Sequence, residues 1–285
     1  MSTESNVLVS AVPLGAVTQC RVVRSQIHGS RRAIAYDLHT DQQQNQQEQN
    51  QQNQQNQQQE QQQNQHVLRA TRTPRTESIF SRYSYDICLA RSSSVVGQVV
   101  SNATGTEFSI IQRSEKPEEE EEEEKGGSKW TEVCAIVYKP RDRKFGHRRG
   151  PRKMAVVIRA VDSSGKAADD CSAVPLAAKY HACVSSGHDT DAAGSIVALE
   201  NKAPRWNARA MAYMLDFGGR VTMASSKNLQ LISMECDRYV VVQFGKTDRD
   251  VFTLDFRFPV SPVMAFGIAV SVMVRKNNAL LFNLK

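Results

Sequence analysis

Short runs of apolar and β-branched residues, separated by polar or turn-forming residues, recur through most of the sequence. Runs of this kind are typical of β-strands. The clearest alternation lies in DVFTLDF at 250–256, where successive side chains point to opposite faces of a strand. The pattern predicts thirteen strands, at residues 17–24, 33–38, 67–71, 83–90, 95–100, 108–112, 133–138, 155–161, 195–199, 212–217, 229–234, 239–244 and 251–256.

The last apolar run, PVSPVMAFGIAVSVMV at 259–274, predicts a helix. Ser261 suits the N-cap and Pro262 the first helical position, while Arg275 and Lys276 suit the negative C-terminal end. The run is shorter than the roughly 20 residues that span a bilayer, and it is apolar all round, so it must be enclosed by protein. The expected fold is therefore mainly β: a closed antiparallel barrel of about twelve strands around a central hydrophobic C-terminal helix.

Two low-complexity tracts interrupt this pattern and set the expected domain organisation. Residues 41–65 are almost all Gln and Asn, and residues 113–129 contain seven consecutive Glu. Each tract separates two predicted strands, where a longer loop costs only about 0.6 kcal/mol per doubling of its length. We expect a short N-terminal arm at 1–12 and one barrel domain at 13–285, with a disordered Gln/Asn-rich insertion and an acidic insertion.

The charge balance favours an acidic partner. The chain carries +6, and the acidic tract, with eight Glu against four Lys or Arg, accounts for −4, which leaves +10 on the remainder. Such a surplus favours nucleic acid or an anionic membrane face. The six cysteines contain no C-x-x-C pair, and the N-terminus lacks the basic flank of a secretory signal, so we expect reduced thiols in an intracellular protein.

Several classes of function find no support in the sequence. Motifs for a nucleophile elbow, a phosphate loop, a dinucleotide fold or a zinc protease are absent, so we expect no enzyme and no cofactor. His181, Cys183 and His188 lie close together, but without a C-x-x-C partner they predict a polar loop and no metal site. Nucleic acid is a weak alternative, because the basic residues lack interleaved aromatics and no helical reader precedes them.

Two stretches differ sharply in charge. SVVGQVVSNATGTEF at 94–108 carries only Glu107, whereas KPRDRKFGHRRGPRK at 139–153 holds eight Lys or Arg against one Asp. A basic residue beside an anionic membrane contributes about 1 kcal/mol, within a Debye length. Because all eight cannot face one surface, this basic segment predicts weak recruitment, and an ordinary solvated loop is the alternative.

The motifs N-K-x-P-x-W-N, F-x-G-R-V-T-x-A-S-x-K-N, Q-F-G-K and D-x-F-T-x-D-F-x-x-P, in the order and spacing found at 201–259, resemble the C-terminal domain of the tubby-like family. GPRKMAVVI, TQCRVVR and SNATGTEFSI are also similar to strands of that family. The resemblance covers about 13–275, apart from the two tracts and the diverged segment 166–194. It implies a twelve-stranded barrel around a hydrophobic helix. It also implies that this domain binds phosphatidylinositol bisphosphate at the plasma membrane.

The resemblance also implies where a head group would bind. The family holds it with Lys and Arg in G-K-x-R-S-N and with an Asn on the preceding strand. Here GQVVSN places Gln98 and Val100 at the Lys and Arg positions and Ser84 at the Asn position. Positions two apart on a strand share a face and can grip vicinal phosphates, but Gln brings no charge and Val no donor. An ordinary strand without a ligand is the alternative for this stretch.

Other basic residues could fill this gap, and further family positions have structural roles. The arginines nearest in sequence are Arg72, Arg82 and Arg91. The residues that match fixed family positions, for which we expect packing and turn geometry, are Trp206, Gly218, Gly219 and Arg220.

The leading hypothesis is a cytoplasmic, peripheral plasma-membrane protein that binds phosphoinositides or anionic lipid. The residues predicted to bind are Arg152, Lys153, Lys144, Arg148, Arg149, Ser84 and Gln98. Some family members also carry receptors into cilia through an N-terminal adaptor, but only about twelve residues precede the barrel here, so trafficking to a cilium or flagellum is the more distant expectation. The rival hypothesis is a protein-interaction scaffold that has lost specific phosphoinositide binding and recognises unknown protein partners.

Overall fold

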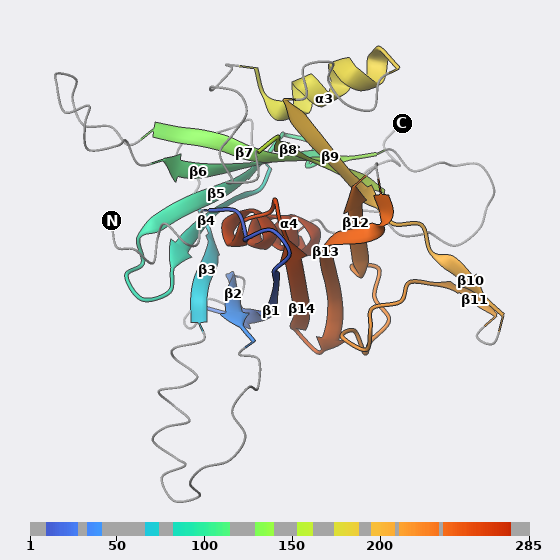
Figure 1. Cartoon of the computed structure of the whole chain (residues 1–285). Coiled ribbons are helices and arrows are strands. Elements are labelled where there is room, and N and C mark those ends of the chain that lie inside the picture. The colour runs from blue at the N-terminus through green and yellow to red at the C-terminus, as the bar shows by residue number, and fades with distance from the viewer. Residues whose placement is uncertain are drawn as a thin grey trace, which may run out of the picture.

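The structure is a computed structural model, and it describes residues 10–27, 33–41, 66–73, 82–114, 129–139, 153–161, 174–187, 195–208, 211–233 and 236–274. Twelve antiparallel strands form a closed barrel in the order β1-β14-β13-β12-β9-β8-β7-β6-β5-β4-β3-β2 (Figure 1). Their bounds are β1 Val17–Gln26, β2 Ile34–Thr40, β3 His66–Arg72, β4 Ser84–Leu89, β5 Val95–Ser101, β6 Glu107–Ser114, β7 Lys129–Tyr138, β8 Met154–Arg159, β9 Ile196–Asn201, β12 Leu229–Ser233, β13 Cys236–Asp248 and β14 Val251–Arg257. The predicted mainly β barrel of about twelve strands is confirmed.

The barrel closes because the first strand pairs with the last. β1 runs antiparallel to β14 from Val17 opposite Arg257 to Val23 opposite Val251. Side chains alternate between the two faces, so that Cys20 and Val22 are buried inside while Arg21 between them is exposed. Closure pairs both edges of this twelve-stranded sheet with one another.

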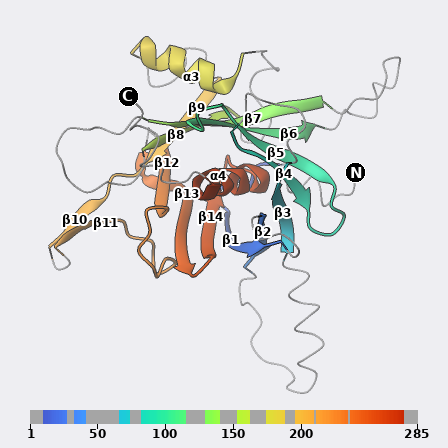
Figure 2. The same cartoon turned by 180° about the vertical axis from the view of Figure 1, so that it is seen from behind.

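Helix α4, Pro262–Val274, fills the centre of the barrel (Figures 1 and 2). The predicted cap at Ser261 is confirmed, because its Oγ accepts a hydrogen bond from the Met264 backbone N–H at 3.2 Å. Gly267 is required by close approach, since a Cβ there would lie 2.6 Å from Cδ1 of Ile110 on β6. The enclosed helix and the inward side chains of the strands thus make one continuous core.

A second helix, α3 at Leu176–Ser185, lies on the outer face of β7, β8 and β9 (Figure 1). Leu176, Tyr180 and Cys183 face the sheet and are buried against residues such as Val157. The prediction of a polar loop at His181 and Cys183 is therefore wrong, and His188 lies outside the described residues. Three apolar positions at helical spacing were enough to bury this Ala-rich segment on the sheet.

One of the thirteen predicted strands lies outside the barrel. Residues 212–217 contribute only β11, Ala212–Met214, which pairs with the unpredicted β10, Arg205–Asn207, in a separate two-stranded ribbon. The ribbon projects away from the barrel in both views (Figures 1 and 2). The other twelve predicted strands each overlap a strand of the barrel.

Alternating strand directions separate the basic and acidic stretches. One end of the barrel, here called the basic end, brings together four points of the chain. They are the turn Asn102–Thr106 after β5, Lys139 just after β7, Lys153 just before β8 and Asn201 at the end of β9. The strand residues that flank the acidic tract, at positions 114 and 129, lie at the opposite end. Residues 42–65 and 115–128 themselves lie outside the described residues.

Candidate functional site

The predicted head-group positions lie on the outer face of the barrel. Val99 points into the core and is fully buried, so Gln98 and Val100 on either side of it point outward from β5. Ser84 on β4 stands directly opposite Val100, and Asp86 stands opposite Gln98. The expected arrangement of two strand positions on one face, with a third residue across from them, is therefore present in the backbone.

A carboxylate occupies this face where the resemblance implies a cation. Nε2 of Gln98 donates a 2.8 Å hydrogen bond to Oδ1 of Asp86, and Oγ of Ser84 donates one of 3.0 Å to Oγ1 of Thr73. Asp86 repels a phosphate at close range. Sequence reasoning named Gln98 and Ser84 but missed Asp86, although pairing Ser84 with Val100 already places Asp86 beside Gln98.

The three arginines nearest in sequence form no hydrogen bond with the Gln98 side chain. The guanidinium of Arg82 lies 5.5 Å from the centre of the Tyr83 ring, in a cation–π arrangement. Within the described residues, the hydrogen bond of the Gln98 side chain goes to Asp86 and not to Arg72, Arg82 or Arg91. The face is thus neutral to acidic around Gln98.

The turn between β5 and β6 explains why S-N-x-x-G-T persists in this sequence. Oδ1 of Asn102 accepts hydrogen bonds from the backbone N–H groups of Thr106, at 2.9 Å, and Glu107, at 3.3 Å. Gly105 has φ of +67°, and a Cβ there would lie 2.8 Å from Cε2 of Tyr83. These residues shape the turn and do not depend on a ligand.

Both ends of the basic segment are fixed at the basic end of the barrel. The Lys139 N–H donates to the carbonyl of Lys153 at 3.0 Å, and the Met154 N–H donates to Oδ1 of Asn201 at 2.7 Å. Nζ of Lys139 donates to Oε1 of Glu200 at 2.5 Å. Burial lowers the pKa of Lys139, but this bond outweighs burial and raises it overall.

The basic residues of this segment therefore differ in what they can contact. Lys139 is neutralised by Glu200, whereas Lys153 is exposed. The predicted binding residues Lys144, Arg148, Arg149 and Arg152 lie outside the described residues. Of the predicted cations, Lys153 is thus the one that the structure places, beside the start of β8 and separated from β5, which carries Gln98 and Val100, by β6 and β7.

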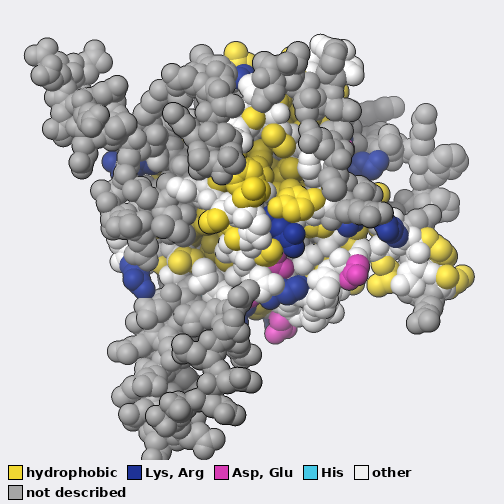
Figure 3. Space-filling view, in the orientation of Figure 1, with side chains coloured by type: hydrophobic (Ala, Val, Ile, Leu, Met, Phe, Trp, Pro, Cys, Tyr) yellow, Lys and Arg dark blue, Asp and Glu magenta, His cyan; other side chains and the backbone are white. Residues whose placement is uncertain are grey.

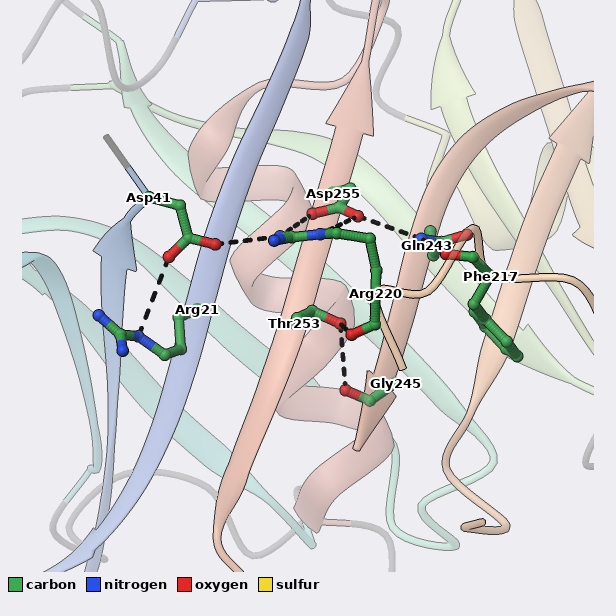
Figure 4. A network of polar contacts seen from close by, with 8 residues as sticks. All are labelled: Arg21, Asp41, Phe217, Arg220, Gln243, Gly245, Thr253 and Asp255. Carbon is green, nitrogen blue, oxygen red and sulfur yellow. Dashed lines mark hydrogen bonds and ion pairs between the residues drawn. The ribbon is translucent and has the colours of Figure 1, made fainter. Parts of the chain in front are cut away.

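Arg220, from F-x-G-R-V-T, holds the connection between β11 and β12 against the outside of the barrel (Figure 4). Its Nη2 and Nε donate to the two carboxylate oxygens of Asp255 at 2.6 and 3.1 Å, and Nη2 also donates to Oδ2 of Asp41 at 3.0 Å. Gln243 donates to the same Asp255 carboxylate at 3.1 Å. The hydrogen bonds to Asp255 raise the pKa of Arg220. This cation therefore stabilises the fold by pairing with Asp255 and Asp41.

The other fixed family positions divide into turn residues and an exposed aromatic. Gly218 and Gly219 have φ of +57° and +77°, and the Gly218 N–H donates to Oδ1 of Asp216 at 2.9 Å, so their predicted role in turn geometry is confirmed. Trp206 is 53% exposed, so the prediction that it packs in the fold is wrong.

A second polar cluster lies on the outer face of β1, β2 and β3. Asp37 is only 5% exposed, and Oδ1 lies 2.6 Å from Nε of Arg69 and 3.1 Å from Nε2 of His66. Burial raises the pKa of Asp37, but the contacts with His66 and Arg69 outweigh it and hold the pKa well below its usual range. Oγ of Ser25 on β1 also donates to Oδ2 of Asp37 at 3.1 Å, so the cluster joins three strands through one buried carboxylate.

The described part of the chain offers neither a metal site nor a helix that could span a membrane. It contains no group of three or more His, Cys, Asp or Glu side chains arranged to hold a metal ion. Its helices are also too short or too polar to cross a bilayer.

Comparison with known proteins found matches over most of the barrel. A model of the Tub family matches residues 8–274. Tubby protein homolog 1 of Caenorhabditis briggsae is 38% identical over 176 residues, which cover 61% of this chain and 40% of that protein. Tubby-related protein 3 of Homo sapiens is 36% identical over 179 residues, with 62% and 38% covered, and tubby-related protein 1 of Mus musculus is 34% identical over 180 residues, with 62% and 31% covered. The matched region spans two fifths or less of these relatives.

Proposed function

The chain belongs to the Tub family, a non-enzymatic family, and on that premise we propose that it is a peripheral membrane protein that docks on phosphoinositide-bearing or otherwise anionic bilayers. Docking takes place at the basic end, chiefly through Lys144, Arg148, Arg149, Arg152 and Lys153. The attraction is electrostatic and reversible, with weak choice among head groups. The location that follows is the cytoplasmic face of the plasma membrane.

The observation that carries this proposal is the anchoring of both ends of the basic segment at one end of the barrel. Hydrogen bonds from Lys139 to Lys153 and from Met154 to Asn201 fix where the segment leaves and returns. The fifteen-residue segment between these two fixed points carries eight Lys or Arg. Lys139 is paired with Glu200, but each of the other cations adds about 1 kcal/mol when it approaches an anionic surface, and a few acting together support recruitment.

We expect little selectivity among lipid head groups because of the residues on the outer face around Gln98. A specific phosphoinositide site needs charge-assisted hydrogen bonds to the phosphates. Gln98 is instead bonded to Asp86, and Val100 supplies no donor. We therefore assign attraction to the basic segment and only a minor role to Ser84 and Gln98.

Vesicle flotation tests the proposal. Vesicles of phosphatidylcholine with phosphatidylserine, or with phosphatidylinositol bisphosphate at equal total charge, are compared with pure phosphatidylcholine at ~0.01 M and ~0.15 M salt. We expect binding to both anionic compositions that weakens as salt rises. Binding that ignores salt, or no binding to anionic vesicles, contradicts the proposal.

A matched pair of triple variants tests the place of docking. Replacement by Gln of three cations in the basic segment, Arg148, Arg149 and Arg152, should weaken flotation strongly. The control replaces three cations near the other end of the barrel, Arg91, Arg113 and Lys179. Equal losses from both variants would mean that only net charge matters and that the basic end has no special role.

The second candidate is a protein-interaction scaffold that has lost lipid binding. The bond between Gln98 and Asp86 favours it, because an acidic residue stands where a phosphate would bind. This function predicts no flotation on either anionic composition, with partner capture that depends on the Gln-rich or Glu-rich tract. Trafficking to a cilium or flagellum would follow from either function only if a cargo protein binds, which capture from ciliated cells with and without the tracts would test.

A further inference from the structure

The ribbon of β10 and β11 exposes large apolar side chains on both faces and at its tip. Arg205 pairs with Met214 and Trp206 with Tyr213, so Met214 and Trp206 stand on opposite faces. Trp206 is 53% exposed, Met214 48% and Met211, between the strands, 74%. Figure 3 shows hydrophobic side chains gathered on this projecting part, at the right of the view, with Lys or Arg side chains beside them.

Such a ribbon is poorly suited to water alone. An isolated two-stranded ribbon is marginally stable, and exposed apolar clusters mark surfaces that meet a partner. A flat protein surface would cover one face and leave either Trp206 or Met214 in water. A lipid interface into which the tip dips covers both faces and Met211 together.

The charges on the ribbon fit an anionic interface. Lys202 precedes β10 and Arg205 lies in it, and residues 202–214 contain no carboxylate. Trp is enriched where bilayers meet water, because its ring is apolar while its N–H needs a polar partner. Arg and Lys can lay their aliphatic stems along the apolar region and keep the charge at the phosphates.

The root of the ribbon lies at the basic end. Asn201, where the connection leaves β9, accepts the hydrogen bond from the Met154 N–H, and the preceding Glu200 pairs with Lys139. A bilayer drawn toward Lys153 therefore meets the barrel beside the base of the ribbon. We propose that the ribbon is a membrane anchor, in which Trp206, Met211 and Met214 insert into the interfacial layer of an anionic bilayer. This inference rests on the proposed function, to which it adds an apolar contact.

The two tryptophans of the chain supply a built-in test. Trp130, 41% exposed, lies at the start of β7 and therefore at the end of the barrel opposite the basic end. Trp130→Phe leaves Trp206 as the sole tryptophan, and Trp206→Phe leaves Trp130. Each variant is mixed with phosphatidylcholine–phosphatidylserine vesicles whose acyl chains are brominated. We expect the emission of Trp206 to shift to the blue and to be quenched, while the emission of Trp130 stays unchanged.

A second variant measures how much the apolar contact contributes. Replacing Trp206, Met211 and Met214 by Ser should weaken vesicle binding by roughly tenfold or more, the effect of withdrawing a large apolar side chain from lipid. Circular dichroism and thermal unfolding confirm that the barrel is intact, as expected for side chains that the core does not use. Unchanged binding by this variant would overturn the anchor.

The outcomes separate the anchor from the proposed function. Flotation of the unmodified chain without quenching of Trp206 overturns the anchor and leaves electrostatic docking in place. No flotation on anionic vesicles overturns both. A blue shift of Trp206 with rising protein concentration, in the absence of vesicles, would assign the ribbon to a second copy of the chain and overturn the lipid partner.

Discussion

Gln98 and Asp86 face each other across β5 and β4, and Nε2 of Gln98 donates to Oδ1 of Asp86 at 2.8 Å. The Lys of the tubby-like pattern at position 98 would meet the same carboxylate. A new cation there would pair with Asp86 before it met a phosphate, because the two groups lie in adjacent strands on one face. The departure from the head-group pattern of the family therefore involves three positions, 86, 98 and 100.

We predict that restoring the pair succeeds only when Asp86 is also neutralised. Gln98→Lys with Val100→Arg should strengthen binding to phosphatidylinositol bisphosphate vesicles slightly, and adding Asp86→Asn should strengthen it much further. Each charge-assisted hydrogen bond to a phosphate contributes about 1.5–3 kcal/mol. Flotation on bisphosphate and phosphatidylserine vesicles of equal charge measures the gain, with Asp86→Asn alone as the control. Equal binding by the double and triple variants would show that Asp86 does not compete.

We predict that the buried carboxylate of Asp37 makes the protein less stable in acid. Its carboxylate is held by Arg69 and His66, and its pKa in the folded chain lies below the usual value of about 3.9. The stabilisation is present above the unfolded pKa and is lost as the pH falls through the range below it. Urea unfolding at pH 7 should show Asp37→Asn about 2 kcal/mol less stable, since the negative charge that strengthens the hydrogen bond from Arg69 is removed.

The pH profile provides the check on this assignment. Between pH 5 and pH 3 the unmodified chain should lose more stability than Asp37→Asn, so the gap between the two should narrow. Asp250→Asn is a matched control, because its partner Arg24 lies 3.3 Å away in a pair that is almost half exposed. A gap that stays constant as the pH falls would contradict the role given to Asp37.

We predict that removing the Arg220 guanidinium, which holds the connection between β11 and β12, lowers the free energy of unfolding. Arg220→Gln leaves Asp255, which is 8% exposed, without its bidentate partner, and an orphaned buried acceptor costs about 1–3 kcal/mol. Arg24→Gln removes an exposed pair and should cost no more than about 1 kcal/mol. Urea unfolding measures both changes. A loss for Arg220→Gln no larger than for Arg24→Gln would mean that the connection is held by other contacts, such as Val221 against Gly245.

The barrel could be predicted because its signals are local and repeated. The β-branched runs placed twelve strands, and Ser261 with Pro262 placed the start of α4. Helix α3 was missed because only Leu176, Tyr180 and Cys183 mark its buried face within an Ala- and Ser-rich stretch. The surplus strand at 212–217 was a short ribbon, which period-two alternation cannot distinguish from a barrel strand.

The site was less predictable because it depends on cross-strand pairing. The residues at 98 and 100 were identified from a motif within one strand, whereas Asp86 comes from the neighbouring strand and depends on the register. The exposure of Trp206 could not be inferred either, because its neighbours Arg205 and Asn207 give no local sign that the ribbon leaves the barrel.

We predict that the negative charge of the acidic tract weakens membrane docking at low salt and has little effect at physiological salt. β7 has ten residues and spans about 30 Å between the flank of the tract and the basic end, since a strand rises roughly 3.3 Å per residue. The Debye length is about 8 Å at 0.15 M salt and about 30 Å at 0.01 M. Replacing Glu118–Glu124 by seven Gln should therefore strengthen flotation on phosphatidylserine vesicles at 0.01 M and leave it nearly unchanged at 0.15 M. Strengthening of equal size at both salt concentrations would mean that the tract reaches the basic end and shields it directly, because only a close contact survives a screening length of this size.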